Sequence, residues 1–360
     1  MPRKKPEPDH SKSSLTFTIE AFDAPETGEP TQYGRFSRNW QDEEALDALI
    51  DQLEAGLVTH KQALMHARKL EATTPDNLEI HNFIANRLWA LGLQDEATEV
   101  YERGFRRAQA HIPKGYTGQI TWSEVDNRSF LRLAHGTLLG LMRERDGKAA
   151  MALAQQMLAW CPMDNIGVRF LLGDIALLTG DHHAALQEYL KGAPNSPAHW
   201  YQAALIAFRE GDYVAACTYL RRGIASNVYI AEGLTGRTVL NEHVALSPES
   251  SARSTHLWAI DYLESAACDW TAEEIDFVDW VFNAAPVLKE RAAWMALNEG
   301  LTYSWDAVER APYAQKSMMF IDRITDTLSK KMVRRVKNRW GDEIWPWDRE
   351  GFKRPQSQAQ

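Results

Sequence analysis

The stretch LLGDIALLTGDHHAALQEYLKGAPNSP, residues 171–197, decides the fold of this chain. Its apolar residues recur at spacings of three and four, as in amphipathic helices, and Gly180-Asp181 interrupts the pattern in the middle. Small residues stand where two helices have to approach closely, at Gly173, Ala185 and Gly192. The stretch therefore predicts two antiparallel helices joined by a turn at Gly180-Asp181.

The same pattern recurs along the chain with a period of about 34 residues. The small residue that corresponds to Ala185 is found in four other units, at Ala63, Ala97, Ala150 and Ala216. This spacing resembles that of tetratricopeptide repeats, in which each unit is a pair of antiparallel helices. About five degenerate units exceed the roughly three that a solenoid needs to bury its faces. We therefore predict an all-α fold, a right-handed α-α superhelix with a C-terminal helical cap.

Composition divides the chain into four regions. Residues 1–40 are rich in Pro, Ser, Thr, Glu and Lys, which predicts a flexible tail, although the alternating piece Leu15–Ile19 is expected to lie against the body. The solenoid is expected over residues 41–240. A Trp-rich helical region over residues 241–348 is expected to end in a basic amphipathic helix, and residues 349–360 are expected to form a second flexible tail.

The Trp-rich region is expected to be helical although the repeat period is lost there. Thr271, followed three residues later by Glu274, is a capping box, which marks the start of a helix. Terminal repeats of a solenoid need a closing element, so we interpret the region as a cap. Its tryptophans are expected to form the core of that cap rather than a ligand site.

Composition also narrows the class of protein. With 44% hydrophobic residues in 360, the chain can bury a sizeable core. Cys161, Cys217 and Cys268 stand far apart, which indicates neither a zinc ribbon nor a disulfide framework. No apolar run approaches the roughly 18 residues of a membrane helix, and no secretory signal is recognisable. We expect a cytoplasmic protein that does not associate with membranes.

The triplet Asp181-His182-His183 raises the alternative of a metal phosphoesterase, because three metal-binding side chains are adjacent. Aligned on the repeat, however, the triplet falls on the turn between two helices, where Asp181 is a natural N-cap. Adjacent helical residues point about 100° apart, so the two histidines do not converge easily on one ion. We expect no metal site, no cofactor and a solvated turn.

Residues 121–174 carry a more specific pattern. Its recognisable parts are Asp126-Asn127-Arg128 and the run Pro162–Leu172, in which Asp164-Asn165 follows the proline. The pattern resembles tetratricopeptide-like proteins grouped with the suppressor of tumorigenicity 7 family, many of them bacterial. The resemblance implies a helical repeat scaffold and no particular reaction.

Two of these motif residues have a physical interpretation of their own. Asp164 or Asn165 is expected to cap the next helix, because its side chain can accept hydrogen bonds from free backbone N–H groups. Arg169, one turn further on, is expected to pair with Asp126 or Glu124 and pin the preceding loop.

The first helix of each repeat is expected to line a concave groove that binds a peptide or partner protein. By analogy with tetratricopeptide proteins, the groove residues are Glu79, Asn82, Asn86, Arg132, His135, Phe170, Asp174, Tyr201, Leu205 and Phe208. The two asparagines suit a peptide backbone. The cations of a two-carboxylate clamp are missing, so we expect a mixed apolar and polar peptide rather than an acidic tail.

A dense basic cluster near the C-terminus is the sharpest remaining signal, and it consists of Lys330, Lys331, Arg334, Arg335, Lys337 and Arg339. Val333, Val336 and Trp340 lie on one face if the segment is helical, which predicts a basic amphipathic helix. The helix is expected to dock on the body through this face. The alternatives are a nucleic-acid contact and an acidic protein partner.

No phosphate-binding Gly loop, nucleophile elbow or Cys–His arrangement is recognisable. The sequence therefore favours a non-enzymatic scaffold that binds a protein or peptide partner. The alternative is a nucleic-acid-associated adaptor that uses residues 330–340.

Overall fold

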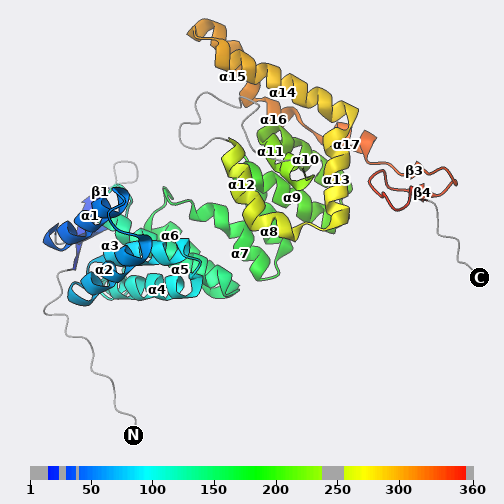
Figure 1. Ribbon diagram of the computed structural model, residues 1–360. Helices are drawn as coiled ribbons and strands as arrows, with labels where there is room; N and C mark the ends of the chain where they lie inside the picture. The colour runs from blue at the N-terminus through cyan, green and yellow to red at the C-terminus, as the bar shows by residue number, and fades with distance from the viewer. Residues whose placement is uncertain (1–14, 24–29, 38–39, 237–254, 354–360) are drawn as a thin grey trace, which may run out of the picture. The chain divides into compact units, whose positions relative to one another are not determined.

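A computed structural model describes residues 15–23, 30–37, 40–236 and 255–353 of the chain (Figure 1). Nearly all of the regular structure is α-helical, and consecutive helices pair as antiparallel hairpins, so the predicted all-α solenoid class is confirmed. The chain divides into two compact units, which we call unit 1 (residues 1–181) and unit 2 (residues 182–360).

Unit 1 is built from helical hairpins in which α1 packs on α2, α3 on α4 and α5 on α6. The pairing continues one step further, because α7 packs on α6. The elements are α1 (Trp40–Glu54), α2 (His60–Thr73), α3 (Leu78–Ala90), α4 (Gln94–Gln109), α5 (Asn127–Arg143), α6 (Gly147–Trp160), the 3-10 turn η2 (Val168–Leu171) and α7 (Leu172–Leu178).

The repeat is visible in the turns within the hairpins. In five turns between consecutive helices a backbone N–H donates to the carbonyl five residues earlier, at Leu57, Leu93, Asp146, Asp181 and Asp212, over 2.9–3.1 Å. The residue before each donor has a positive φ, at Gly56, Gly92, Arg145, Gly180 and Gly211. The predicted small residues Ala63, Ala97, Ala150, Ala185 and Ala216 are all fully buried. The predicted repeat is therefore confirmed in both its turns and its close helix contacts.

The N-terminal segment differs from the prediction of a flexible tail. Strands β1 (Thr16–Asp23) and β2 (Pro30–Ser37) form an antiparallel hairpin with Phe17 opposite Phe36. The Phe36 ring is fully buried and lies 4.8 Å from the ring of Phe130. The tail prediction is wrong for these strands because a buried aromatic side chain and paired backbone stabilise them. Residues 1–14 lie outside the described residues.

Asn127 is the residue that holds this hairpin on unit 1. Its Oδ1 accepts from the Phe36 backbone N–H at 3.0 Å, and its Nδ2 donates to the Gly34 carbonyl at 3.0 Å. Asn127 itself is fully buried at the start of α5. The Asn127 side chain thus continues the ladder bonds of β2, next to the backbone bonds that Gln119 makes with Gln32 and Gly34.

In unit 2, α8 packs on α9 and α9 on α10, and the C-terminal helices α13, α14 and α17 pack on α10 (Figure 1). The predicted helical cap is therefore present, and the capping box of Thr271 and Glu274 opens α13 as expected. The helices are α8 (His182–Gly192), α9 (Pro197–Arg209), α10 (Tyr213–Ser226), α11 (Val228–Leu234), α12 (Thr255–Ala266), α13 (Ala272–Asn283), α14 (Ala285–Tyr303), α15 (Ala307–Met318), α16 (Phe320–Arg323) and α17 (Asp326–Met332). The boundary expected at residue 240 falls outside the described residues.

The tryptophans of unit 2 have mixed environments. Trp347 is 2% exposed and its ring centroid lies 4.7 Å from that of Phe277 and 5.1 Å from that of Tyr213, so it belongs to the core as predicted. Trp305, at the α14–α15 turn, is 93% exposed and belongs to no core.

The predicted basic amphipathic helix is wrong beyond Met332, where α17 ends. The chain continues as two short antiparallel strands, β3 (Val336–Lys337) and β4 (Glu343–Ile344). The Asn338 side chain accepts from the backbone N–H groups of Trp340 and Asp342. These bonds close a tight turn, which is incompatible with a continuous helix. Consecutive cations at helical spacing also repel one another.

Candidate functional site

A cavity of about 470 Å3 opens on unit 1 between α3 and α5. It is lined by Asn82, Asn86, Trp89, Ala90, Tyr101, Trp122, Arg132, His135, Gly136, Leu139, Asn165 and Ile166. Four residues predicted for the groove, Asn82, Asn86, Arg132 and His135, therefore lie together on one surface. We call this surface the unit 1 groove.

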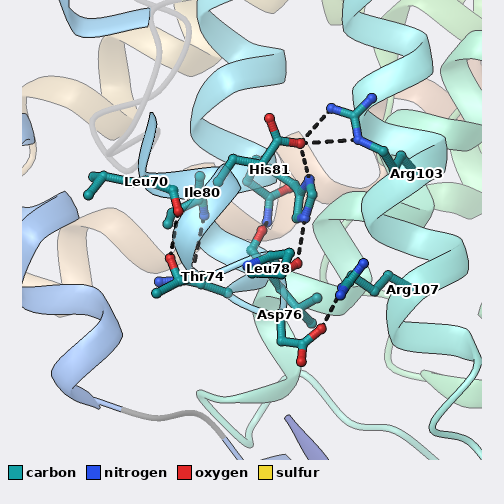
Figure 2. Close-up of polar contacts among 12 residues, drawn as sticks. Leu70, Thr74, Asp76, Leu78, Ile80, His81, Arg103 and Arg107 are labelled. Atoms are coloured by element: carbon teal, nitrogen blue, oxygen red, sulfur yellow. Dashed lines mark hydrogen bonds and ion pairs between the residues drawn. The ribbon is translucent and has the colours of Figure 1, made fainter. Parts of the chain in front are cut away.

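The position of α3 is determined by a network at its N-terminus (Figure 2). Asn77 caps the helix by accepting from the backbone N–H groups of Glu79 and Ile80 at 3.0 and 3.3 Å. The preceding helix α2 ends with the Thr74 hydroxyl donating to the Leu70 carbonyl at 2.9 Å. These bonds set the direction in which α3 leaves the turn, and with it the groove face of the helix.

Glu71 and His81 connect this corner to α4 (Figure 2). The buried His81 ring donates from Nε2 to the Pro75 carbonyl at 3.0 Å and places Nδ1 3.3 Å from the Glu71 carboxylate. Arg103 donates to the same carboxylate at 2.5 and 3.1 Å. The hydrogen bond from His81 and the charge of Arg103 outweigh burial and lower the pKa of Glu71 to about 2.

Asn82 presents a buried acceptor to the groove. Its Nδ2 donates to the Ser129 carbonyl at 3.0 Å and to the Leu78 carbonyl at 3.3 Å, which determines how the amide is oriented. Its Oδ1 is buried and has no hydrogen-bond partner among the described residues. An unpaired buried oxygen costs about 1–3 kcal/mol, so this atom is a place where a ligand N–H is stabilising.

Asn86 presents a donor one turn along the same helix. Its Oδ1 accepts from the Tyr101 hydroxyl at 2.6 Å, and burial raises the pKa of Tyr101, so that the hydroxyl remains a donor. Asn86 is an exposed residue that lines the cavity. Trp89, a further turn along, is 40% exposed and adds an apolar wall.

The charged residues of the groove are already neutralised or neutral. Arg132 donates to the Glu79 carboxylate at 3.2 and 3.3 Å, and its guanidinium lies 5.5 Å from the centre of the Trp122 ring. Burial lowers the pKa of His135, against the opposing effect of the Asp164 carboxylate. His135 is therefore a neutral imidazole near pH 7.

A strained loop supplies the far wall. Asp164 has a φ of 50°, which is unusual for a residue with a side chain, and its carboxylate accepts from the backbone N–H groups of Val168 at 2.7 Å and Arg169 at 2.9 Å. The predicted cap by Asp164 is thus confirmed. The strained turn places Asn165 and Ile166 against the cavity.

The predicted partners of Arg169 are wrong. Arg169 pairs with Asp164 at 2.8 Å and also donates to the Pro162 and Met163 carbonyls. Asp126 and Glu124 pair instead with Arg35 of β2, at 3.4 and 3.6 Å. The sequence analysis placed Leu15–Ile19 against the body, but it did not predict the second strand, β2, that brings Arg35 to this position.

The other predicted groove residues do not join the site. Phe170 and Asp174 belong to unit 1 but are not among the residues that line the cavity. Tyr201 is fully buried and its hydroxyl donates to the Asn227 carbonyl at 2.6 Å. Leu205 and Phe208 are 3% and 8% exposed. The prediction is corrected for these last three, because other parts of unit 2 cover the α9 face.

The Asp181-His182-His183 triplet lies on the predicted turn at the start of α8, and all three residues are exposed. In the part of the chain that the structure describes, no three His, Cys, Asp or Glu side chains gather in an arrangement that could hold a metal ion. Asp174 and Asp181 each also interact with other residues of the protein. The triplet is therefore assigned no role in the groove.

Sequence reasoning missed two tryptophans of the groove. Trp89 lies seven residues after Asn82 on α3, so helical spacing alone was sufficient to find it. Trp122 comes from the loop before α5, outside the repeat, and no periodicity predicts its position.

Comparison with known proteins leaves the family open. No protein-family model matches the chain and no curated protein matches it, so the resemblance to the suppressor of tumorigenicity 7 family stays a prediction. Solved structures that resemble it include the MamA RS-1 ArsTM double mutant, at 12% identity and a TM-score of 0.40 over 51% of this chain and 92% of that one. The P58(IPK) TPR domain matches at 14% identity and a TM-score of 0.23 over 79% and 89%. The assignment of the fold rests on the repeating hairpins of the chain itself.

Proposed function

We propose that the protein is a non-enzymatic scaffold and that the unit 1 groove binds an extended, uncharged segment of a partner protein. The observation that carries the proposal is that Asn82 lines the cavity and that its buried Oδ1 has no hydrogen-bond partner among the described residues. A backbone N–H of a bound peptide would satisfy it.

The neighbouring donor fits the same kind of ligand. Asn86 uses its Oδ1 for Tyr101 and leaves its Nδ2 hydrogens for a ligand carbonyl. One acceptor and one donor on successive turns of α3 match the C=O and N–H groups that every peptide unit offers. The Trp89 ring and the Leu139 and Ile166 side chains then provide an apolar surface for one peptide side chain.

The charge of the groove argues against an acidic ligand. The Arg132 guanidinium is paired with Glu79, and His135 is neutral. A peptide carboxylate bound here loses its hydration without gaining an unpaired cation. We therefore expect the contacting part of the partner to carry apolar and polar but uncharged side chains.

The lining of the cavity bears on catalysis. The described residues that line it include His135 and Tyr101, which could act as general acid or base, but no Cys, Ser, Lys, Asp or Glu. All three cysteines are free thiols, which suits the reducing cytoplasm. Among the described helices, none combines the length and the apolar composition needed to cross a bilayer.

The test uses peptides selected from a random display library on the immobilised full-length protein. Trp89→Ala combined with Asn86→Ala should weaken the best peptides at least about 10-fold in fluorescence anisotropy, because both contacts are lost. Trp258→Ala is the matched control, since Trp258 is 45% exposed in unit 2. Equal binding by the double variant, or selected peptides dominated by Asp and Glu, would overturn the assignment.

A further inference from the structure

A separate basic surface in unit 2 takes no part in the groove. Residues 330–339 contain six Lys or Arg and no Asp or Glu. All six are exposed, and within the described ranges none of them has a carboxylate at ion-pair distance. Three other arginines of unit 2 behave differently: Arg209, Arg221 and Arg349 each pair with a Glu or an Asp. We call residues 330–344 the basic hairpin.

The basic hairpin is held in one conformation. The Asn338 amide donates to the Asp342 carboxylate at 3.1 Å and to the Gly351 carbonyl at 2.9 Å, while its Oδ1 accepts from two backbone N–H groups. The residues after it are anchored by Trp345 and Trp347, whose rings stack at 5.1 Å. Its cations are therefore presented on a fixed backbone, which lowers the entropy lost on binding.

An aromatic ring lies among these cations. Trp340 is 37% exposed, and the Arg339 guanidinium lies over it, 4.2 Å from the ring centre. Arg335 lies in the same way over Trp345, at 4.8 Å. Alternating cations and flat rings are the combination that holds phosphates and unstacked bases of single strands.

The side chains of the basic hairpin distinguish between three possible anionic partners: a membrane, a nucleic-acid duplex and a single strand. A membrane-binding loop would present several apolar side chains at its tip, whereas the turn from Asn338 to Asp342 carries a single one, Trp340. Val336 and Trp340 are each only 37% exposed. A duplex offers no free base to the Trp340 ring. We propose that the basic hairpin is a binding site for single-stranded nucleic acid, with Arg334, Lys337 and Arg339 on phosphates and Trp340 beneath a base.

The experiment measures anisotropy of a fluorescein-labelled oligouridine of about 20 nucleotides with the full-length protein. Three phosphate contacts predict a slope of about −2.1 for log affinity against log salt, or a loss of ~20-fold between about 50 and 200 mM salt. The triple variant Arg334→Ala, Lys337→Ala, Arg339→Ala should make the slope shallower by about 2. Trp340→Leu should weaken binding about 10-fold while leaving the slope unchanged.

Matched controls separate this surface from general charge. Lys61→Ala, Lys69→Ala and Lys148→Ala together remove three exposed cations from unit 1 and should leave binding unchanged. The proposal is overturned if oligouridine does not bind at low salt or if the triple variant binds like the wild type. It is equally overturned if a duplex binds as tightly and Trp340→Leu has no effect, or if phosphatidylserine vesicles bind and the oligonucleotide does not.

Discussion

The groove position of the repeat is open in unit 1 and covered in unit 2. Asn86 and Trp89 line a cavity, whereas Leu205 and Phe208, which the repeat places in the corresponding positions, are at most 8% exposed. In unit 2 this face is covered by a segment of the chain that lies outside the repeats. The Trp347 ring of that segment lies 6.2 Å from the ring of Phe208. Repeat spacing thus predicts which helix face a residue occupies, but not whether that face reaches solvent.

Unit 1 also has an added segment, but it covers a different place. The β1–β2 hairpin buries Phe36 against Phe130 and bonds to Asn127, and neither residue lines the groove. The two units therefore differ in which repeat positions reach solvent, because their added segments dock at different positions. Three predictions test this contrast.

The largest effect is expected for the covering residue of unit 2. Trp347→Ala removes a ring that contacts Phe208, Tyr213 and Phe277, and should destabilise unit 2 by about 3–5 kcal/mol, the usual cost of emptying a core site. Trp89→Ala in the open groove should cost about 0.5 kcal/mol or less. Urea unfolding followed by circular dichroism measures both, and equal midpoints for the two variants would contradict the comparison.

A smaller effect is expected where the unit 1 hairpin is attached. Asn127→Ala removes bonds to the Phe36 N–H, the Gly34 carbonyl and the Thr121 carbonyl, and should cost about 2–3 kcal/mol. Hydrogen exchange of the Phe36 amide, which donates to Asn127, should accelerate, whereas the exposed Asn165→Ala serves as the control. Unchanged exchange at this amide would show that the hairpin is held by its other contacts, the aromatic packing and the backbone bonds to Gln119.

The smallest effect concerns pH at the corner that positions α3. Because the pKa of Glu71 is lowered to about 2, its carboxylate stabilises the folded state above about pH 4.5, and this contribution is lost as the pH falls toward 2. Glu71→Gln should lower stability at pH 7 by about 1 kcal/mol after solvent screening, and the gap to wild type should close below pH 4.5. Thermal unfolding across pH 2–7 measures it, with the surface variant Glu96→Gln as the control; a gap that persists at pH 2 assigns the effect to packing.

Local signals predicted the helices and their contacts, because turns and close approaches depend on neighbouring residues. Ala185 and Thr271 had the predicted roles for that reason. The predictions for the β1–β2 hairpin and for the basic segment failed because residues distant in the sequence determine the structure of both. The Phe36 backbone N–H donates to the Asn127 side chain. The backbone after Met332 is directed by the packing of Trp347 on Phe277 and does not continue the helix that its own pattern predicts. The groove was found in part, since α3 and α5 follow the repeat whereas Trp122 does not.

The bonds between Asn127 and the β1–β2 hairpin also determine when unit 1 can close during synthesis. Asn127 follows Phe36 by 91 residues, so at roughly 5–20 residues per second the ribosome adds it about 5–20 s later. Until then the Phe36 side chain has no Phe130 to pack against, and the strand edges can pair with other nascent chains. The rate of translation between these two residues therefore sets how long the new chain is exposed to aggregation.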